Sequence, residues 1–287
     1  MVDNELGLTA VYNGCIYDYR ELRAELEGHG YRFFSHSDTE VILKGYHHWG
    51  TDVVSHLHGM FAFVIAERDT GRGVLARDRL GIKPLYVDHT GARLRFASTV
   101  QALLAAGDVD TSIDRTALSY YLTFHSVVPA PRTILKGVRK LPPATVRTVE
   151  PDGSASDHEY WNPQFTRDED RSDWSEQDWQ DGLVERLRTA VQRRMVADVP
   201  VGVLLSGGID SSLVVSYMAE HASDVRTFSI DFPLAKFSEG EHAREVARVY
   251  GTRHEDLVVE PDILPVVASA VRAAASKSMS THSRSTP

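Results

Sequence analysis

Short apolar runs alternate with polar segments of helical period along the first part of the chain. Residues 8–14 (LTAVYNG) read as a strand, and residues 19–30 read as an amphipathic helix that a glycine ends. Residues 37–50 predict a second helix, with Ser37 or Asp38 as its N-cap. The chain is therefore expected to begin as strand, helix, helix.

Two hairpins are predicted next. Residues 61–78 place the polar segment 69–73 between two apolar strands, and residues 84–98 do the same around 89–91. The first half is therefore expected to be α+β with an antiparallel sheet.

The pattern loosens between residues 110 and 165, where prolines interrupt it at 129, 131, 142, 143, 151 and 163. Such a segment favours a connection between domains over a third compact domain. A charged stretch, RDEDRSDWSEQD, then leads into a helix predicted over 182–194, whose apolar residues repeat at four-residue spacing.

Strands and helices alternate in the second half, which predicts a doubly wound α/β parallel sheet with ligands at the carboxyl ends of its strands. The expected elements are strands over 201–205, 225–232 and 254–259 and helices over 211–222 and 242–251. After Leu264 the alternation stops, and the chain becomes rich in Ala, Ser and Arg.

These patterns predict a domain over residues 1–125, a connecting segment over 126–172, and a second domain over 173–265. A disordered or aberrant tail is expected over 266–287. Three parallel strands that ended at 265 would leave one side of their sheet uncovered, so the second domain is expected to be incomplete.

Composition adds few constraints. A chain of 287 residues with 42% hydrophobic and 25% charged residues can form one large or two ordinary globular domains. A net charge of -9 argues against nucleic acid as a partner. With one cysteine, Cys15, and neither a signal peptide nor an apolar span, the chain is expected to be cytoplasmic, with no membrane partner.

The strongest chemical signal is SGGIDSS, residues 206–212. It follows an apolar strand and opens a helix, so backbone N–H groups and the helix dipole converge on an anion. Gly207 and Gly208 permit close backbone approach, and Asp210 suits a Mg²⁺ ion that bridges phosphates. The competing interpretation is an ordinary glycine-rich turn with a serine cap.

SGGIDSS resembles the pyrophosphate loop of ATP pyrophosphatases, and ADVPVGVLLSGGIDSSLV resembles the synthetase domain of glutamine-hydrolysing asparagine synthetases. The resemblance implies a fold of the adenine nucleotide alpha-hydrolase type, with ATP and Mg²⁺ as cofactors. Asp231 departs from the family, which usually has Gly there. The resemblance assigns pyrophosphate to Ser206, Gly207, Gly208, Ile209, Asp210, Ser211 and Ser212, Mg²⁺ to Asp210, and adenine to backbone or apolar groups of Leu205 and Ile230.

Asn13-Gly14 and the SDTE segment that contains Asp38 resemble the glutamine-binding elements of class II amidotransferases, which are α+β sandwiches of the N-terminal-nucleophile type. The resemblance assigns Asn13 and Gly14 to the oxyanion site and Asp38 to the α-amino group of glutamine, and it places Cys15 among the substrate-binding residues. An amide and an N–H suit an oxyanion, and a carboxylate suits an ammonium. Taken alone, Asn-Gly could be a turn and Asp38 a helix cap. The blocks GMFAF, ARDRLGIKPLY and KLPPA match as structural signatures.

Class II amidotransferase domains begin with a cysteine whose own α-amine is the general base. This chain begins Met1-Val2, so the nucleophile, the first strands and an arginine that grips glutamine are expected to be missing. Cys15 cannot replace the nucleophile, because its nitrogen lies within a peptide bond. The continuation of the synthetase domain past about residue 260 is expected to be missing too, which would make both domains incomplete.

For an intact protein, the resemblance implies an ATP- and glutamine-dependent amide ligase that works through an acyl-adenylate, and this chain is expected to lack full activity. The acceptor carboxylate stays open, because NGCIY is similar to a relative that amidates N-acetylglutaminylglutamine, whereas most asparagine synthetases have Glu after Asn-Gly. Two alternatives stay open, a non-catalytic nucleotide-binding fragment and a product that does not fold stably. A homodimer also stays open. His47, His48, His56 and His58 lack a third ligand at metal-binding spacing and are interpreted as solvated or core residues.

Overall fold

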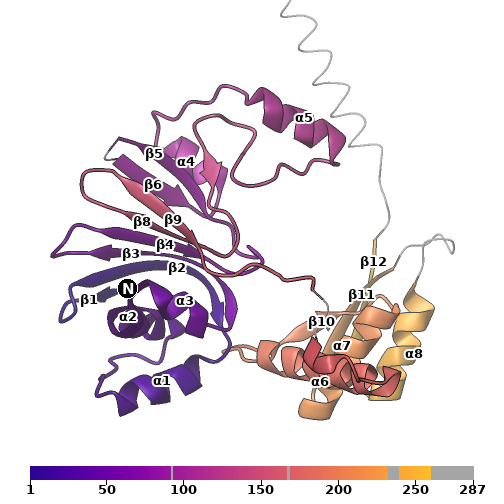
Figure 1. Ribbon diagram of the computed structural model, residues 1–287. Coiled ribbons are helices and arrows are strands. Elements are labelled where there is room, and N and C mark those ends of the chain that lie inside the picture. The colour runs from indigo at the N-terminus through magenta and orange to yellow at the C-terminus, as the bar shows by residue number, and fades with distance from the viewer. Residues whose placement is uncertain (92, 167–168, 232–238, 260–287) are drawn as a thin grey trace, which may run out of the picture. The chain divides into compact units, whose positions relative to one another are not determined.

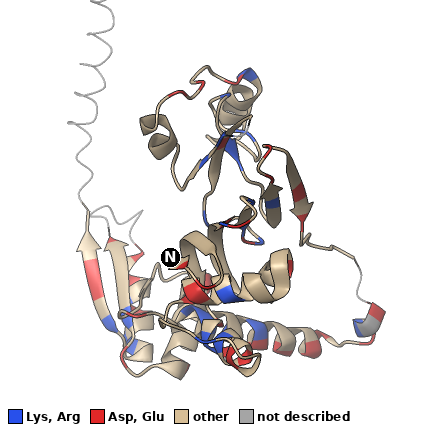
Figure 2. Ribbon diagram, turned by 90° about the vertical axis from the view of Figure 1, so that its left-hand side faces the viewer, with Lys and Arg blue, Asp and Glu red and all other residues tan. Residues whose placement is uncertain are grey.

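A computed structural model describes residues 1–91, 93–166, 169–231 and 239–259, and the chain divides into two units, Met1–Ser172 and Asp173–Pro287 (Figure 1). The tail predicted over 266–287 lies outside the described residues. No described helix is long and apolar enough to cross a membrane. Figure 2 shows Lys and Arg interspersed with Asp and Glu on both units.

The first unit is built on two antiparallel sheets, as the hairpin pattern predicted. The larger has six strands in the order β1-β2-β3-β4-β8-β9, and the smaller has three in the order β6-β5-β7. The strands are β1 (Val2–Asp3), β2 (Leu8–Ile16), β3 (Gly59–Glu67), β4 (Gly73–Arg77), β5 (Tyr86–Thr90), β6 (Arg93–Ala97), β7 (Arg139–Lys140), β8 (Thr145–Val149) and β9 (Ala155–Glu159). The helices are α1 (Tyr19–Gly28), α2 (Asp38–Trp49), α3 (Val53–His56), α4 (Val100–Ala105) and α5 (Arg115–Thr123).

Strand β3 is buried on both faces, and this organises the unit into layers. Phe61, Phe63 and Ile65 belong to a core cluster that also includes residues of α1, α2 and α3. Ala62 and Val64 point the other way and pack with residues of the second sheet. Alternation of side chains along a strand therefore produces a helix–sheet–sheet order, which is visible in Figure 1.

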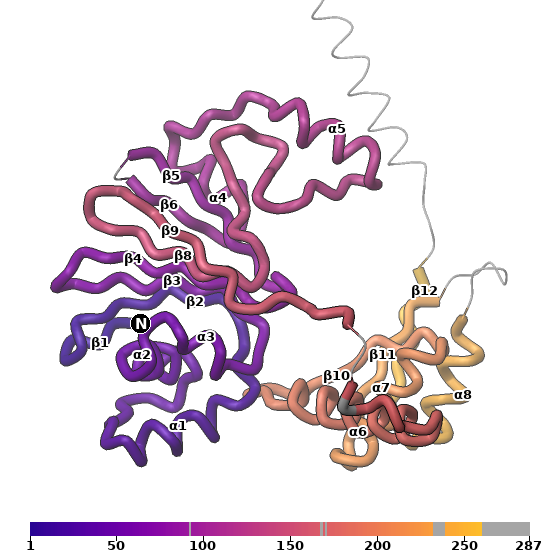
Figure 3. The backbone as a smooth tube through the Cα atoms, viewed as in Figure 1, coloured from indigo at the N-terminus to yellow at the C-terminus, as the bar shows by residue number. Residues whose placement is uncertain are grey.

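Residues 126–172 differ from the expected connecting segment. They contribute β7, β8 and β9 to the first unit, and β8 pairs with β4 from Val146 to Val149. The tube in Figure 3 follows this return of the chain across the sheet. The prolines in this segment flank the strands and do not interrupt them, which is where proline is tolerated.

The second unit contains a parallel sheet in the order β10-β11-β12. Its elements are α6 (Glu176–Arg194), β10 (Gly202–Leu204), α7 (Ile209–His221), β11 (Arg226–Asp231), α8 (Gly240–Tyr250) and β12 (Arg253–Val258). Helix α6 begins earlier than predicted, because Ser175 and Asp178 form a capping box at its start. The end of the charged stretch, from Glu176 onward, is therefore helical.

One face of this sheet packs on α7 and α8 through a small core that contains Leu205, Val215 and Ala243. The opposite face is exposed within the described residues. There Leu204 is 74% exposed, Ile230 54% and Leu257 63%. Parallel strands and alternating helices are thus present, while a second helical layer, which a doubly wound fold requires, stays a prediction.

Candidate functional site

Gly14 lies within β2, at a position where a larger residue would clash with β3. It stands opposite Phe61 of β3, and a Cβ atom at Gly14 would lie 2.2 Å from the Met60 carbonyl oxygen. Gly59 is in the same situation, because its Cβ atom would lie 2.3 Å from the Cys15 carbonyl oxygen. Two glycines therefore let β2 and β3 approach closely, and Asn13-Gly14 is part of a strand, not a turn.

The side chains of Asn13, which is part of β2, and of Asp38, which is part of α2, lie on different sides of β2. The Asn13 side-chain amide donates to the Ser98 hydroxyl at 3.3 Å, just after β6. Asp38 Oδ2 accepts hydrogen bonds from the Tyr12 hydroxyl at 2.7 Å and from the Ile16 backbone N–H at 3.1 Å. Because neighbouring side chains of a strand point to opposite faces, the structure does not bring Asn13 and Asp38 into direct contact.

Helix α2 positions Asp38 through its cap. The Ser37 hydroxyl accepts from the Thr39 N–H at 3.1 Å, so Ser37 is the N-cap and Asp38 is the first residue of the helix. The carboxylate of Glu40 is fully buried and accepts from the backbone N–H groups of Phe34 and Ser35 at 2.8 and 2.7 Å. The preceding loop is thereby fixed to the helix that carries Asp38.

Tyr12 and Ser98 were missed by sequence reasoning. Burial and the hydrogen bond to Asp38 both raise the pKa of the Tyr12 phenol well above its ordinary value. Tyr12 therefore stays protonated and keeps donating to Asp38. A tyrosine beside Asn-Gly in a strand was the available signal, but its partner depends on how α2 packs.

Cys15 pairs with Met60 in the β2–β3 ladder and is half-buried. Its nitrogen is a backbone amide in mid-strand, so Cys15 has no α-amine that could act as a general base. This agrees with the sequence argument that Cys15 is not the N-terminal nucleophile. Its place beside Gly14 keeps it near the predicted glutamine elements.

The ARDRLGIKPLY block builds a loop in which Asp78 and Arg77 bond to backbone groups. Asp78 is buried and accepts from four backbone N–H groups, those of Phe61, Leu80, Ile82 and Lys83. Arg77 donates to three carbonyl oxygens, including that of Leu141 at 2.6 Å. These bonds explain the block as a structural signature.

In the second unit, SGGIDSS forms the turn from β10 into α7. Gly207 has φ +77°, and a Cβ atom there would lie 2.6 Å from the His242 Cβ of α8. Gly207 is therefore required by both its backbone conformation and its packing.

Three serines tie this loop together. The Ser206 hydroxyl lies 3.0 Å from the Ser211 hydroxyl, and the Ser212 hydroxyl donates to the Gly208 carbonyl oxygen at 2.7 Å. Gly208 is the N-cap of α7, a helix of 13 residues, so the N–H groups of its first turn have no carbonyl partner within the helix. A helix N-terminus presents such N–H groups as possible donors to an anion.

Asp210 is exposed in the first turn of α7. Among the described residues, no group of three or more His, Cys, Asp or Glu side chains is placed to hold a metal ion. The assignment of Mg²⁺ to Asp210 stays a prediction.

Leu205 and Ile230 face opposite sides of the parallel sheet. Leu205 is 2% exposed, its N–H donates to the Phe228 carbonyl oxygen at 2.8 Å, and its carbonyl oxygen accepts from the Ser229 hydroxyl. The Leu205 side chain is thus part of the core, and only backbone atoms of this residue could contact a nucleotide. The Ile230 side chain is 54% exposed, and its predicted contact to adenine stays a prediction.

Asp231 has an ionic partner of its own. Arg244 Nη1 of α8 lies 3.5 Å from Asp231 Oδ2 and 3.0 Å from Asp256 Oδ2. The alternation of β11 directs Asp231 toward α8, away from the face that exposes Ile230. The departure from glycine at this position is therefore accommodated by Arg244.

Two known families match successive parts of the chain. A family described as "Glutamine amidotransferase domain" matches residues 1–161, and one described as "Asparagine synthase" matches residues 182–286.

Three curated relatives illustrate the similarity. "Asparagine synthetase [glutamine-hydrolyzing] 1" of Bacillus subtilis is 40% identical over 88% of this chain and 39% of its own length. A "Putative asparagine synthetase [glutamine-hydrolyzing]" of Mycobacterium bovis is 38% identical over 88% of this chain and 39% of its own. "Amidase chry2" of Gibberella zeae is 33% identical over 85% of this chain and 37% of its own. The chain thus spans about two fifths of the length of these relatives.

Proposed function

Because the chain belongs to the glutamine amidotransferase domain family and continues into a region similar to asparagine synthase, we propose that the protein is an ATP- and glutamine-dependent amide ligase. The observation that carries this proposal is the presence of two groups of candidate binding residues in one chain. The first unit holds Asn13-Gly14 and Asp38 around one strand, and the second holds SGGIDSS at a strand–helix junction.

In the first unit, the proposed role of Asp38 is to bind the α-ammonium group of glutamine. The Tyr12 hydroxyl and the Ile16 N–H fix Asp38 Oδ2, so the carboxylate is oriented before a ligand arrives. The Asn13 amide and the Gly14 N–H would serve the oxyanion that forms as the glutamine amide is hydrolysed to glutamate and ammonia. Cys15 is proposed to contact the substrate without acting as the nucleophile.

In the second unit, the proposed role of the 206–212 loop is to bind the phosphates of ATP. The N–H groups of the first turn of α7, which have no carbonyl partner within the helix, are donors suited to phosphate oxygens. Asp210 is the side chain that would hold Mg²⁺, which when bound would neutralise phosphate charge. Ile230 would offer an apolar contact to adenine.

The proposed reaction begins when a carboxylate oxygen of the acceptor attacks the α-phosphorus of ATP and pyrophosphate leaves. Ammonia from glutamine then attacks the acyl carbon of the acyl-adenylate, which forms the amide and releases AMP. Aspartate and an N-acetylglutaminylglutamine-like dipeptide are the candidate acceptors. The second is favoured by Cys15, which stands where most asparagine synthetases carry Glu.

Exchange of labelled pyrophosphate into ATP tests the proposal. The full chain with Mg²⁺ and either acceptor should catalyse exchange, and Asp210→Asn should reduce the rate by at least about tenfold, because a metal ligand is lost. Asp224→Asn, on the loop before β11, is the charge-matched control and should leave the rate unchanged. ATP binding without exchange for either acceptor would instead support a non-catalytic nucleotide-binding module.

A further inference from the structure

Ser98 contacts Asn13, one of the two residues proposed to stabilise the oxyanion. The Ser98 hydroxyl accepts a hydrogen bond from the Asn13 side-chain amide, with 3.3 Å between Nδ2 and Oγ. Asn13 belongs to β2 of the larger sheet, whereas Ser98 follows β6 of the smaller sheet. The bond therefore joins the two sheets at a residue of the proposed glutamine site.

The backbone of Asn13 is fixed by β2, but its amide is not fixed by the strand alone. Asn13 is in register with Ala62 of β3, in the middle of the ladder. The terminal torsion of an asparagine has only a broad, roughly two-fold preference, so pairing of the backbone leaves the amide group free to turn. Half a turn would replace the N–H group by the carbonyl oxygen, which would repel an oxyanion. An oxyanion donor here therefore needs a second contact that holds the amide.

Ser98 stands at a rigid junction that can supply this contact. The residue before it, Ala97, pairs with Tyr86 of β5. The residue after it, Thr99, is the N-cap of α4, and its hydroxyl accepts from the Ala102 N–H at 3.3 Å. Strand pairing on one side and a helix cap on the other thus set the place of the Ser98 hydroxyl.

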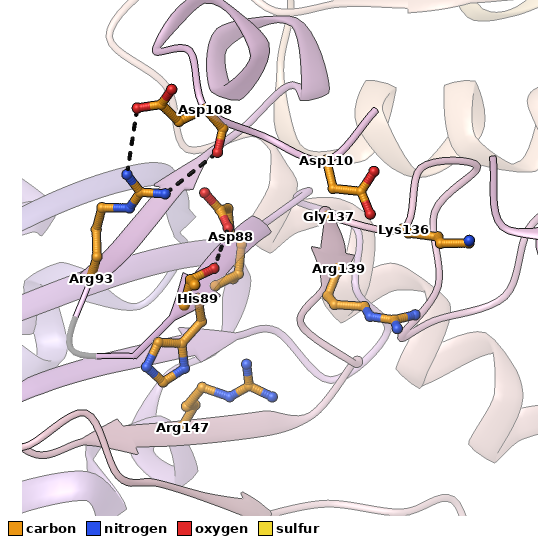
Figure 4. Close-up of a pocket in the computed structure, with 11 residues that line it drawn as sticks. Asp88, His89, Arg93, Asp108, Asp110, Lys136, Gly137, Arg139 and Arg147 are labelled. Carbon is orange, nitrogen blue, oxygen red and sulfur yellow. Dashed lines mark hydrogen bonds and ion pairs between the residues drawn. The ribbon is translucent and has the colours of Figure 1, made fainter. Parts of the chain in front are cut away.

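The segment that follows α4 is tied back to β6 as well. Arg93 of β6 donates to the Asp108 carbonyl oxygen at 3.4 Å, and its Nη1 atom lies 3.8 Å from Asp108 Oδ2 (Figure 4). Arg95, also in β6, donates to the carbonyl oxygens of Ala106 at 3.2 Å and of Asp108 at 3.1 Å. Strand β6 and helix α4 are therefore held together by bonds that do not involve Asn13.

The Gly14 N–H, the other proposed donor, faces away from β3. Phe61 stands opposite Gly14, but its N–H donates to Asp78 and its carbonyl oxygen accepts from the Asp78 N–H. Gly14 and Phe61 are therefore an antiparallel pair that exchanges no hydrogen bonds. The Ile16 N–H, two residues on, points the same way as the Gly14 N–H and bonds to Asp38. A ligand along this edge of β2 would meet both Asp38 and the Gly14 N–H.

We propose that Ser98 is a positioning residue, which holds the Asn13 amide so that an N–H of Asn13 joins the Gly14 N–H at the oxyanion. A side-chain amide has two N–H bonds. One is used by Ser98, and the other stays available for the ligand. The inference rests on the proposed function, because it assigns the ligand oxygen to glutamine. Ser98 acts only through Asn13 and touches no reacting atom.

Calorimetric titration of the full chain with L-glutamine and with L-norvaline tests this role. L-norvaline keeps the α-ammonium group that Asp38 is proposed to bind, but it has no side-chain amide. Ser98→Ala should weaken L-glutamine binding about fivefold, since one hydrogen bond is lost, and should leave L-norvaline affinity unchanged. Ser98→Thr keeps the hydroxyl and should restore L-glutamine affinity. Ser119→Ala, at an exposed serine of α5, is the control and should change neither affinity.

The two ligands separate failure of this inference from failure of the proposed function. Absence of binding of both ligands to the unchanged protein would disprove the glutamine site and the role of Ser98 with it. If the unchanged protein binds L-glutamine and Ser98→Ala binds it equally well, only the role of Ser98 is overturned. Equal weakening of both ligands in Ser98→Ala would also overturn that role, because it would mark a general disturbance of the first unit.

Discussion

The hydroxyl of Tyr12 donates a 2.7 Å hydrogen bond to Asp38 Oδ2, which joins strand β2 to the first turn of α2. Asp38 is the residue proposed to bind the glutamine ammonium, so Tyr12 acts on glutamine through the position of that carboxylate. Removal of the hydroxyl should therefore affect glutamine binding more than folding.

We expect Tyr12→Phe to weaken L-glutamine binding roughly fivefold, because one hydrogen bond to a charged group is lost while the aromatic ring keeps its packing. Calorimetric titration measures the affinity, and circular dichroism checks the fold. Tyr120→Phe, on α5, is the matched control and should bind as the unchanged protein does. Equal affinity in Tyr12→Phe and Tyr120→Phe would refute the positioning role.

Gly14→Ala should destabilise the first unit by several kcal/mol, since its Cβ atom would meet the Met60 carbonyl oxygen at 2.2 Å and force β2 away from β3. Urea unfolding measures the change in the free energy of unfolding. Gly28→Ala at the end of α1 is the control, because its Cβ atom would meet nothing within 4 Å. If the two variants were equally stable, the close approach of β2 and β3 would be disproved.

Lys44 Nζ and Asp3 Oδ2 form an ion pair at 2.6 Å, with side chains only 5% and 3% exposed. Lys44→Met should cost about 3–5 kcal/mol, because it leaves a buried carboxylate without its cation. Arg68→Met removes an exposed pair with Asp69 and should cost less than about 1 kcal/mol. Chemical denaturation compares the two, and a similar loss in both would contradict the buried pair.

The same pair predicts a pH dependence. Burial acts to raise the pKa of Asp3, but hydrogen bonds from Lys44 and from the Leu6 and Glu5 N–H groups together lower it. A lowered pKa in the folded state contributes stability above the unfolded-state value of about 3.9, and this stability is lost as the pH falls through the folded-state value. The stability difference between the unchanged protein and Asp3→Asn should therefore be largest near neutral pH and shrink in acid. A difference that grows on acidification would contradict this sign.

In the second unit, comparison of Gly207→Ala with Gly251→Ala separates the stability cost of a positive φ from the cost of a steric clash. Both glycines have positive φ, +77° and +62°, but only Gly207 has close neighbours. Gly251→Ala should cost about 1 kcal/mol of stability and leave ATP affinity unchanged. Gly207→Ala should cost more and reduce ATP affinity at least about tenfold, because α8 must move from the loop. Thermal unfolding and nucleotide titration measure both effects, and retained ATP affinity in Gly207→Ala would argue against this loop as the phosphate site.

Local sequence patterns were sufficient to predict several helices and strands. Ser37 followed by a helical apolar pattern predicted the start of α2, and the apolar runs on either side of 69–73 predicted the β3–β4 hairpin. Strand β9 was not predicted, because all five of its residues are exposed and its stability comes from pairing with β8. Its sequence therefore lacks the alternation that marks a strand.

The sequence motifs named candidate site residues, but their arrangement could be described only from the structure. Asn13 and Asp38 were named from their motifs, yet their separation on two faces of β2 depends on strand register and on the packing of α2. Leu205 and Ile230 likewise looked equivalent as apolar neighbours of a nucleotide, and only the alternation of β10 and β11 places one in the core.

Transfer of ¹⁸O from the carboxylate of a labelled acceptor to AMP tests the proposed ligase most directly. An acyl-adenylate contains one acceptor oxygen bonded to phosphorus, so release of the amide leaves that oxygen on AMP. With an ammonium salt as the nitrogen donor, ATP and Mg²⁺, mass spectrometry should find one ¹⁸O atom in each AMP formed. Unlabelled AMP, or ADP with labelled phosphate, would contradict activation of the acceptor as an acyl-adenylate.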